Sequence, residues 1–168
     1  PLKLKEIIIA LIFTALIRTL IGLVPAVILT SPLFGVSILK LGLPLLLLFL
    51  SLYIFGITLG LFVSAGLIRF GPSFENIAWS SLFLLAPLGC IYYPIEILPN
   101  FFQIIAKGLP LVYIFDETRN ILLNDFINYK NLIQAYFLNL VYLIAGISLF
   151  YFSFLKARIK GTLINMGE

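Results

Sequence analysis

The longest run of residues without a charge limits this chain to one environment. Residues 41–68 contain no Asp, Glu, Lys or Arg over 28 positions, and a helix needs about 20 mainly apolar residues to cross a bilayer. The rest of the chain agrees, since 62% of its 168 residues are hydrophobic and only 11% are charged. So few polar residues exclude a soluble enzyme, a nucleic-acid-binding domain and a disordered chain. The sequence therefore predicts an integral membrane protein.

Three further stretches are long enough to span the membrane. They are residues 7–29, which are interrupted by Arg18, and residues 77–95 and 131–155, which carry no charge. We therefore expect an all-α polytopic membrane protein in which residues 1–168 form a single transmembrane domain with four transmembrane helices.

Lysine and arginine orient these spans, because both residues gather in short cytoplasmic loops. Basic residues follow the last span directly at Lys156, Arg158 and Lys160, and they precede the first at Lys3 and Lys5. Both ends are therefore expected to be cytoplasmic, with Arg69 in the inner loop between the second and third spans. The basic residues left for the outer side are Lys40, Lys107, Arg119 and Lys130.

The residue types present exclude several kinds of chemistry. There is no histidine and Cys90 is the single cysteine, which excludes His-based catalysis, His-based metal sites and an intrachain disulfide. No P-loop motif for ATP hydrolysis occurs, and no pair of carboxylates lies inside a predicted span. An intramembrane hydrolase or a proton-coupled carrier would place ionisable groups there. We expect no catalytic, cofactor-binding or metal-binding residue in this chain.

Two features of the first two spans have both a functional and an ordinary interpretation. Gly56, Gly60 and Ser64 are four residues apart and form a groove of small residues on one helix face, which fits either a subunit interface or packing inside one bundle. Arg18 near the middle of the first span either lines a pathway or pairs with an acid, or it reaches the lipid headgroups.

The segment after the third span predicts two short helices. Pro94 and Pro99 break the span, and a polar stripe then follows at i, i+3 and i+7, made of Asn100, Gln103 and Lys107. Gly108 and Pro110 end that first helix, and a second apolar piece leads into Asp116 and Arg119, which can pair on one helical face. Neither piece is long enough to span. We interpret residues 96–124 as a pair of re-entrant, amphipathic half-helices on the outer side; the alternative is a helical hairpin on the membrane surface.

The order of these elements resembles the ATP-binding-cassette (ABC) type-2 exporter permeases. The resemblance lies in residues 66–123, where a short inner loop with a helix start is followed by an apolar span and then by Tyr93-Pro94, Leu98-Pro99, Leu109-Pro110 and an acid three residues before Arg119. The opening residues also resemble the family's segment after its first cytoplasmic coupling helix, so the resemblance covers nearly the whole chain.

The resemblance implies a transport subunit that performs no covalent chemistry. Such a permease has six spans, pairs with a second permease copy as a homodimer or heterodimer, and works with separate ABC ATPase subunits that bind ATP and Mg. By that alignment the chain is the C-terminal part and lacks the first two spans. Glu117 stands where relatives often have a small residue.

The resemblance also assigns roles to residues of this chain. The inner loop would contact the ATPase through Arg69, Pro72, Phe74 and Glu75, although composition alone fits a plain connector equally well. The re-entrant helices would close the outer end of the pathway through Tyr93, Pro94, Glu96, Pro99, Gln103, Lys107 and Pro110. Asp116 with Arg119 would fix the start of the last span.

We therefore expect an exporter permease in a bacterial cytoplasmic membrane or a plastid membrane, surrounded by lipids and with no nucleic-acid partner. A membrane scaffold or assembly protein without transport activity is the alternative. A secondary carrier fragment ranks third, because charges within the spans are scarce.

Overall fold

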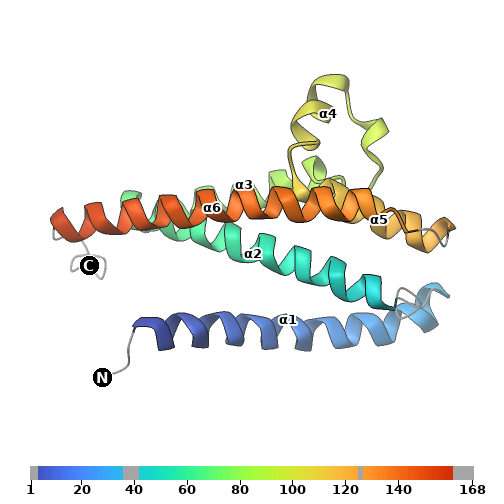
Figure 1. Ribbon diagram of the computed structural model, residues 1–168, viewed down its shortest axis with the longest axis horizontal. Helices are drawn as coiled ribbons and strands as arrows, with labels where there is room; N and C mark the ends of the chain where they lie inside the picture. Colours follow the sequence, from blue (N-terminus) through green and yellow to red (C-terminus); the bar gives the residue numbers. More distant parts are fainter. Residues whose placement is uncertain (1–3, 36–41, 125–126, 161–168) are drawn as a thin grey trace. The chain divides into compact units, whose positions relative to one another are not determined.

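The computed structural model describes residues 4–35, 42–124 and 127–160 (Figure 1). Within these residues there are six α-helices, one short 3-10 helix and no strand, which confirms the all-α fold class. The chain divides into two compact units, Pro1–Leu47 and Leu48–Glu168, and each is described by itself.

Three helices are long and apolar enough to cross a membrane. They are α1 (Leu4–Phe34), α2 (Leu43–Phe70) and α6 (Tyr129–Lys160). They correspond to the first, second and fourth predicted spans and are consistent with an integral membrane protein.

Helix α1 continues through two prolines. Pro25 and Pro32 both lie inside it, so the helix ends five residues beyond the predicted boundary at residue 29. Its threonine hydroxyls donate to carbonyl oxygens one turn back, as Thr14 does to Ala10 at 2.7 Å and Thr19 to Ala15 at 2.8 Å. Polar side chains satisfied on their own helix, and prolines, are both tolerated in membrane helices.

Helices α2 and α6 run parallel to each other through the second unit. The Asn139 amide donates to the Ser51 hydroxyl oxygen at 2.8 Å and to the Ser51 carbonyl at 2.9 Å. Further along, the Phe55 and Tyr142 rings meet edge to face with centroids 6.4 Å apart. From the first contact to the second, the residue number increases in both α2 and α6, so the two helices are parallel. The alternating steps of three and four residues are those of a helix–helix seam.

Close backbone approach continues this seam at Gly146 of α6. A β-carbon added to Gly146 would lie 3.4 Å from Leu61 Cβ and 3.5 Å from the Thr58 carbonyl oxygen. Small residues allow such approach where packing, rather than the hydrophobic effect, holds helices together in lipid. The seam therefore combines a polar clamp at Ser51 and Asn139 with a small-residue contact one turn beyond Tyr142.

Helix α3 (Phe74–Leu88) turns back from the end of α2. The turn uses Gly71, whose φ of +80° suits glycine, and the Phe74 ring lies against Gly66 so closely that a β-carbon there would overlap it. The third predicted span, residues 77–95, differs from the structure because the helix ends at Leu88. Pro87 lacks an N–H for the last turn, and the Gly89 and Cys90 amides close it onto Leu85 and Pro87.

Helix α5 (Pro110–Asn124) lies antiparallel to the first half of α6. The Gly108 carbonyl just before α5 accepts a hydrogen bond from the Tyr142 hydroxyl at 3.0 Å, whereas Glu117 in the next turns of α5 bonds Asn128 and Asn131 at the start of α6. The segment between α3 and α5, residues 89–109, contains the 3-10 helix η2 (Ile95–Ile97) and helix α4 (Asn100–Ala106). We call this segment the excursion. This excursion stands off from α5 and α6 (Figure 1).

Removing the Ser51 hydroxyl is expected to weaken the seam between α2 and α6. Ser51→Ala loses a fully buried hydrogen bond to Asn139, and such bonds are worth about 0.6 kcal/mol on average and up to about 1.7 in membrane helices. Ser148→Ala is the matched control, because that hydroxyl is exposed and bonds only its own helix. Unfolding in mixed micelles measures both variants, and equal losses would contradict the clamp.

Candidate functional site

The residues expected to form the outer gate lie together in one part of the structure. They extend from the end of α3 through η2 and α4 to the middle of α5. The short helix expected after Pro99 is present as α4, which begins at Asn100 as the polar stripe predicts. The second expected helix is present as α5, which begins at Pro110, carries Asp116 and Arg119, and ends at Asn124, the last residue of the predicted segment.

Helix breaks in this segment leave backbone carbonyls that side chains of the same chain satisfy. Where a helix ends, carbonyl oxygens lose their partner amides and need another donor. The five donor and acceptor pairs are Tyr93 to Pro87 (2.9 Å), Arg119 to Cys90 (2.9 Å), Gln103 to Leu98 (2.8 Å), Tyr113 to Lys107 (2.9 Å) and Tyr142 to Gly108 (3.0 Å). We call these five bonds the carbonyl caps. The Pro87 carbonyl also accepts the Cys90 backbone N–H.

The predicted prolines stand at the turns between the caps. Pro94 and Pro99 have extended backbones directly before η2 and α4, and Pro110 is the buried first residue of α5. Proline suits these positions because it has no N–H that would need a partner at a helix start. Of the polar residues expected at the gate, Gln103 turns inward onto Leu98, whereas Glu96 and Lys107 are exposed.

Cys90 is the buried centre around which the excursion closes. It takes a left-handed conformation with φ of +53°, which is uncommon for a residue other than glycine. Its thiol is fully buried and donates to the Leu88 carbonyl at 3.7 Å. Cys90 packs with Ala106 and Val112, and around them lie Tyr93, Ile95, Leu98 and Leu109.

The pairing expected between Asp116 and Arg119 is present on α5. Arg119 Nη2 lies 3.8 Å from Asp116 Oδ1, and the two side chains are 25% and 38% exposed. The guanidinium also reaches across to the Cys90 carbonyl through Nη1. Arg119 therefore joins α5 to the end of α3, and of the pair it is Asp116 that contacts the start of α6, through Asn131.

Glu117 lies at the centre of a polar junction that sequence reasoning missed. Its side chain is fully buried. One carboxylate oxygen accepts the backbone N–H of Asn128 at 2.6 Å, and the other accepts the side-chain N–H of Asn131 at 3.3 Å. Asn131 also donates to Asp116 at 3.1 Å. The acid that had been noted only as a departure from the family pattern thus holds α5 against the start of α6.

Asn128 also caps helix α6. Its side-chain oxygen accepts the Lys130 amide N–H at 3.1 Å, and its carbonyl accepts that of Asn131, as at many helix N-termini. The signal that could have revealed this junction is the pair Asn128 and Asn131 at the start of an apolar run, together with the adjacent acids Asp116 and Glu117 in the preceding helix.

The inner-loop residues divide into one packing residue and three exposed ones. Phe74 lies on Gly66 and stacks with Phe70 at 5.6 Å, so its ring holds the turn. Arg69, Pro72 and Glu75 are exposed, and the Arg69 guanidinium lies 5.4 Å from the centroid of the neighbouring Phe70 ring.

The groove of small residues on α2 lies away from α6. Added β-carbons at Gly56 and Gly60 would meet nothing within 4 Å, and both positions are exposed while Ser64 is half-buried. The residues of α2 that face α6, such as Ser51 and Phe55, lie on the other side of the helix. In the first unit, Arg18 is exposed on α1.

No group of three or more metal-ligating side chains occurs in the part of the chain that the structure describes. Comparison of the chain with protein-family models, with curated proteins and with solved structures finds no match. The functional argument therefore rests on the residues and their geometry.

Removing tyrosine hydroxyls is expected to loosen the segment between α3 and α6. Tyr113→Phe and Tyr142→Phe each free a capped carbonyl while keeping the ring, at a cost of about 1 kcal/mol each. Tyr151→Phe, at an exposed α6 position, is the control. Hydrogen–deuterium exchange of residues 105–112 measures the loosening; unchanged exchange in both variants would show that the caps are dispensable.

Glu117→Ala is expected to destabilise the junction of α5 and α6. The substitution leaves the Asn128 backbone N–H without its acceptor and removes one of the two acceptors of the Asn131 side chain, which keeps its bond to Asp116. Loss of an acceptor costs roughly 1–3 kcal/mol where the donor is shielded from water. Glu117→Gln keeps one acceptor oxygen and should cost less. The melting temperature in mild detergent ranks these variants against Glu75→Ala, an exposed acid expected to change nothing. Equal stability of Glu117→Ala and Glu75→Ala would contradict the junction.

Proposed function

We propose that this chain is the membrane-spanning permease subunit of an ABC-type exporter. It forms the substrate pathway, performs no covalent chemistry itself and depends on a separate ATPase subunit that binds ATP and Mg. The observation that carries the proposal is the segment in residues 66–123, where the family-like order of motifs coincides with a broken, internally capped run of helices.

The direction of the helices supports a fourth membrane crossing in the proposed permease. Because α2 and α6 are parallel, both cross in the same sense, and the chain between them must return to the side from which α2 started. Helices α3 and α5 have 15 residues each, so each is about 22 Å long and neither spans alone. We propose that α3 begins the return crossing and α5 completes it, with η2 and α4 as the re-entrant excursion between them.

The orientation follows from the basic residues. Arg69 ends α2, and Lys156 and Arg158 lie in the last turns of α6, so the parallel pairing brings these cations to the same end of the second unit. That end is proposed to be cytoplasmic. Lys3 and Lys40, which contributed to the expected orientation, lie outside the described residues.

The excursion and α5 are proposed to close the outer end of the pathway. The carbonyl caps support this placement, since a broken helix at membrane depth needs its freed backbone groups satisfied by protein. Along α3, a shallow depression offers polar groups to a pathway from within an otherwise apolar helix; its lining residues are Asn76, Ile77, Ser80, Ser81 and Leu84.

Contact with the ATPase is proposed at the turn between α2 and α3. Exposure of Arg69, Pro72 and Glu75 supports this role, while Phe74 is assigned to holding the turn. A second permease copy is the proposed partner for the open face of Gly56, Gly60 and Ser64. That open face equally favours the second candidate function, a membrane scaffold without transport.

The experiment that tests the proposal is purification of the native complex in mild detergent. We expect a separate P-loop ATPase to co-purify, with vanadate-sensitive ATP hydrolysis. Glu75→Arg should reduce the recovered ATPase several-fold, because it reverses an exposed charge at the proposed contact. Lys130→Glu, an exposed charge reversal at the start of α6, should leave recovery unchanged. A stable preparation without any ATPase would favour the scaffold.

A further inference from the structure

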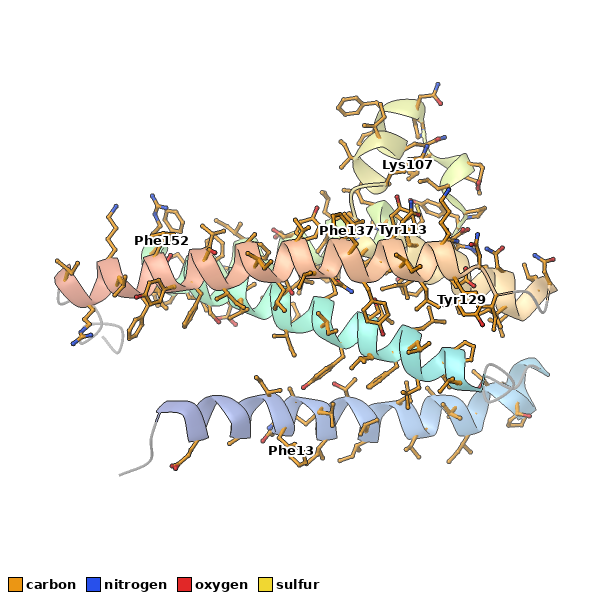
Figure 2. All side chains as sticks on the ribbon, in the orientation of Figure 1. Phe13, Lys107, Tyr113, Tyr129, Phe137 and Phe152 are labelled. Atoms are coloured by element: carbon orange, nitrogen blue, oxygen red, sulfur yellow. The ribbon has the colours of Figure 1, made fainter. Side chains whose placement is uncertain are left out.

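The excursion carries an apolar edge that the rest of the second unit leaves uncovered. The exposed large hydrophobic residues on it are Tyr92 and, along η2 and α4, Ile97, Phe101, Phe102, Ile104 and Ile105, of which Phe101 is 68% and Ile104 75% exposed. Side chains of this kind radiate from the excursion, away from the long helices (Figure 2). A patch of aromatic and branched residues gathered on one short segment marks a contact surface rather than ordinary surface composition.

Both ends of the excursion are tied to the other helices at the level of the first turn of α5. Gly89 stands so close to Leu111 that a β-carbon on Gly89 would lie 2.8 Å from Leu111 Cδ1. At the other end, the Gly108 carbonyl accepts the Tyr142 hydroxyl. The depth of Tyr142 on α6 therefore gives the depth at which the excursion leaves the helices and returns.

The length of α6 places Tyr142 inside the hydrocarbon. Lys156 is the first charge after the apolar stretch of α6, and counting back about 20 residues places the opposite hydrocarbon boundary near Tyr136. The rise from Tyr136 to Tyr142 is about 9 Å along a helix. At this level the exposed α6 residues include Phe137, Val141 and Ile144, as expected of a helix surrounded by lipid.

Several backbone groups of the excursion find partners within the excursion itself. The Ile97 amide donates to Pro94 and the Gln103 amide to Pro99, the Leu98 carbonyl is capped by Gln103, and the prolines carry no N–H. The remaining polar side chains of the excursion, Glu96, Asn100 and Lys107, are exposed. An apolar edge with a few exposed polar groups beside it is the composition of a segment lying about 5–10 Å into the headgroup and acyl boundary.

We propose that this edge is a lipid-contact site, with its phenylalanines and isoleucines among the acyl chains of the leaflet nearer the start of α6. Glu96, Asn100 and Lys107 then reach the headgroups. The lipid contact rests on the broken return crossing of the proposed permease and does not depend on an ATPase partner.

Tryptophan quenching by lipid tests the contact. Trp79, itself exposed on α3, is first replaced by Phe, and single tryptophans are introduced as Phe101→Trp and Ile104→Trp. The controls are Phe137→Trp on α6 and Leu123→Trp near the end of α5, at positions 64% and 79% exposed. Each chain is reconstituted into phosphatidylcholine vesicles whose acyl chains carry bromine near the glycerol or near the terminal methyl group.

The expected result is that bromine near the glycerol quenches F101W and I104W as strongly as F137W, and that iodide in the buffer scarcely affects them. L123W should show the reverse pattern, since it lies beyond the proposed hydrocarbon. Strong quenching of F101W and I104W by iodide would overturn the proposal in favour of a hairpin in water. Protection of both from lipid and iodide would overturn it in favour of a protein partner. Neither result depends on whether an ATPase co-purifies. Failure of the lipid contact would therefore leave the co-purification test of the permease proposal unaffected.

Discussion

A broken helix inside a membrane is stable only if its freed carbonyls find donors within the protein, and the proposed return crossing of the second unit depends on that constraint. Water is not available in hydrocarbon, and each unsatisfied backbone group costs several kcal/mol there. The donors come from the excursion itself, from α5 and from α6. Tyrosine suits this task, because its ring packs in apolar surroundings while its hydroxyl reaches a carbonyl. Tyrosines that would only pack against neighbouring side chains in an unbroken helix therefore determine where the chain can turn.

The parallel pairing of α2 and α6 supplies the second constraint. Hydrogen bonds from Asn139 to Ser51 fix the register, and the contact of Gly146 with Thr58 and Leu61 sets how closely the helices approach. Two parallel helices need an intervening return, and the 15-residue lengths of α3 and α5 explain why the proposed return is divided. The excursion between them is thus a consequence of helix length as much as of proline placement.

The sequence predicted the features that depend on local composition. The long apolar helices, the start of α4 at Asn100 and the pairing of Asp116 with Arg119 all follow from residues close together in the chain. The end of α3 was placed too late, because Pro94 was taken as the breaking residue while Pro87 and Gly89 close the helix earlier. The contacts of Glu117 and Asn139 were not foreseen. Ser51 and Asn139 are 88 residues apart, and no local period indicates which turn of one helix faces which turn of another.

The distribution of the carbonyl caps also limits how the proposed gate could move. Three of the five carbonyl caps join the end of α3, the excursion and α5 to one another, the Gln103 cap lies within the excursion, and only the Tyr142 cap crosses to α6. Moving the excursion alone would break the Tyr93, Tyr113 and Tyr142 caps. Moving it together with α5 and the end of α3 would keep four of the caps and would break the Tyr142 cap and the bonds of Asp116 and Glu117 to the start of α6. In a working permease the end of α3, the excursion and α5 would therefore shift as one body, with the junction of α5 and α6 as the place where it yields.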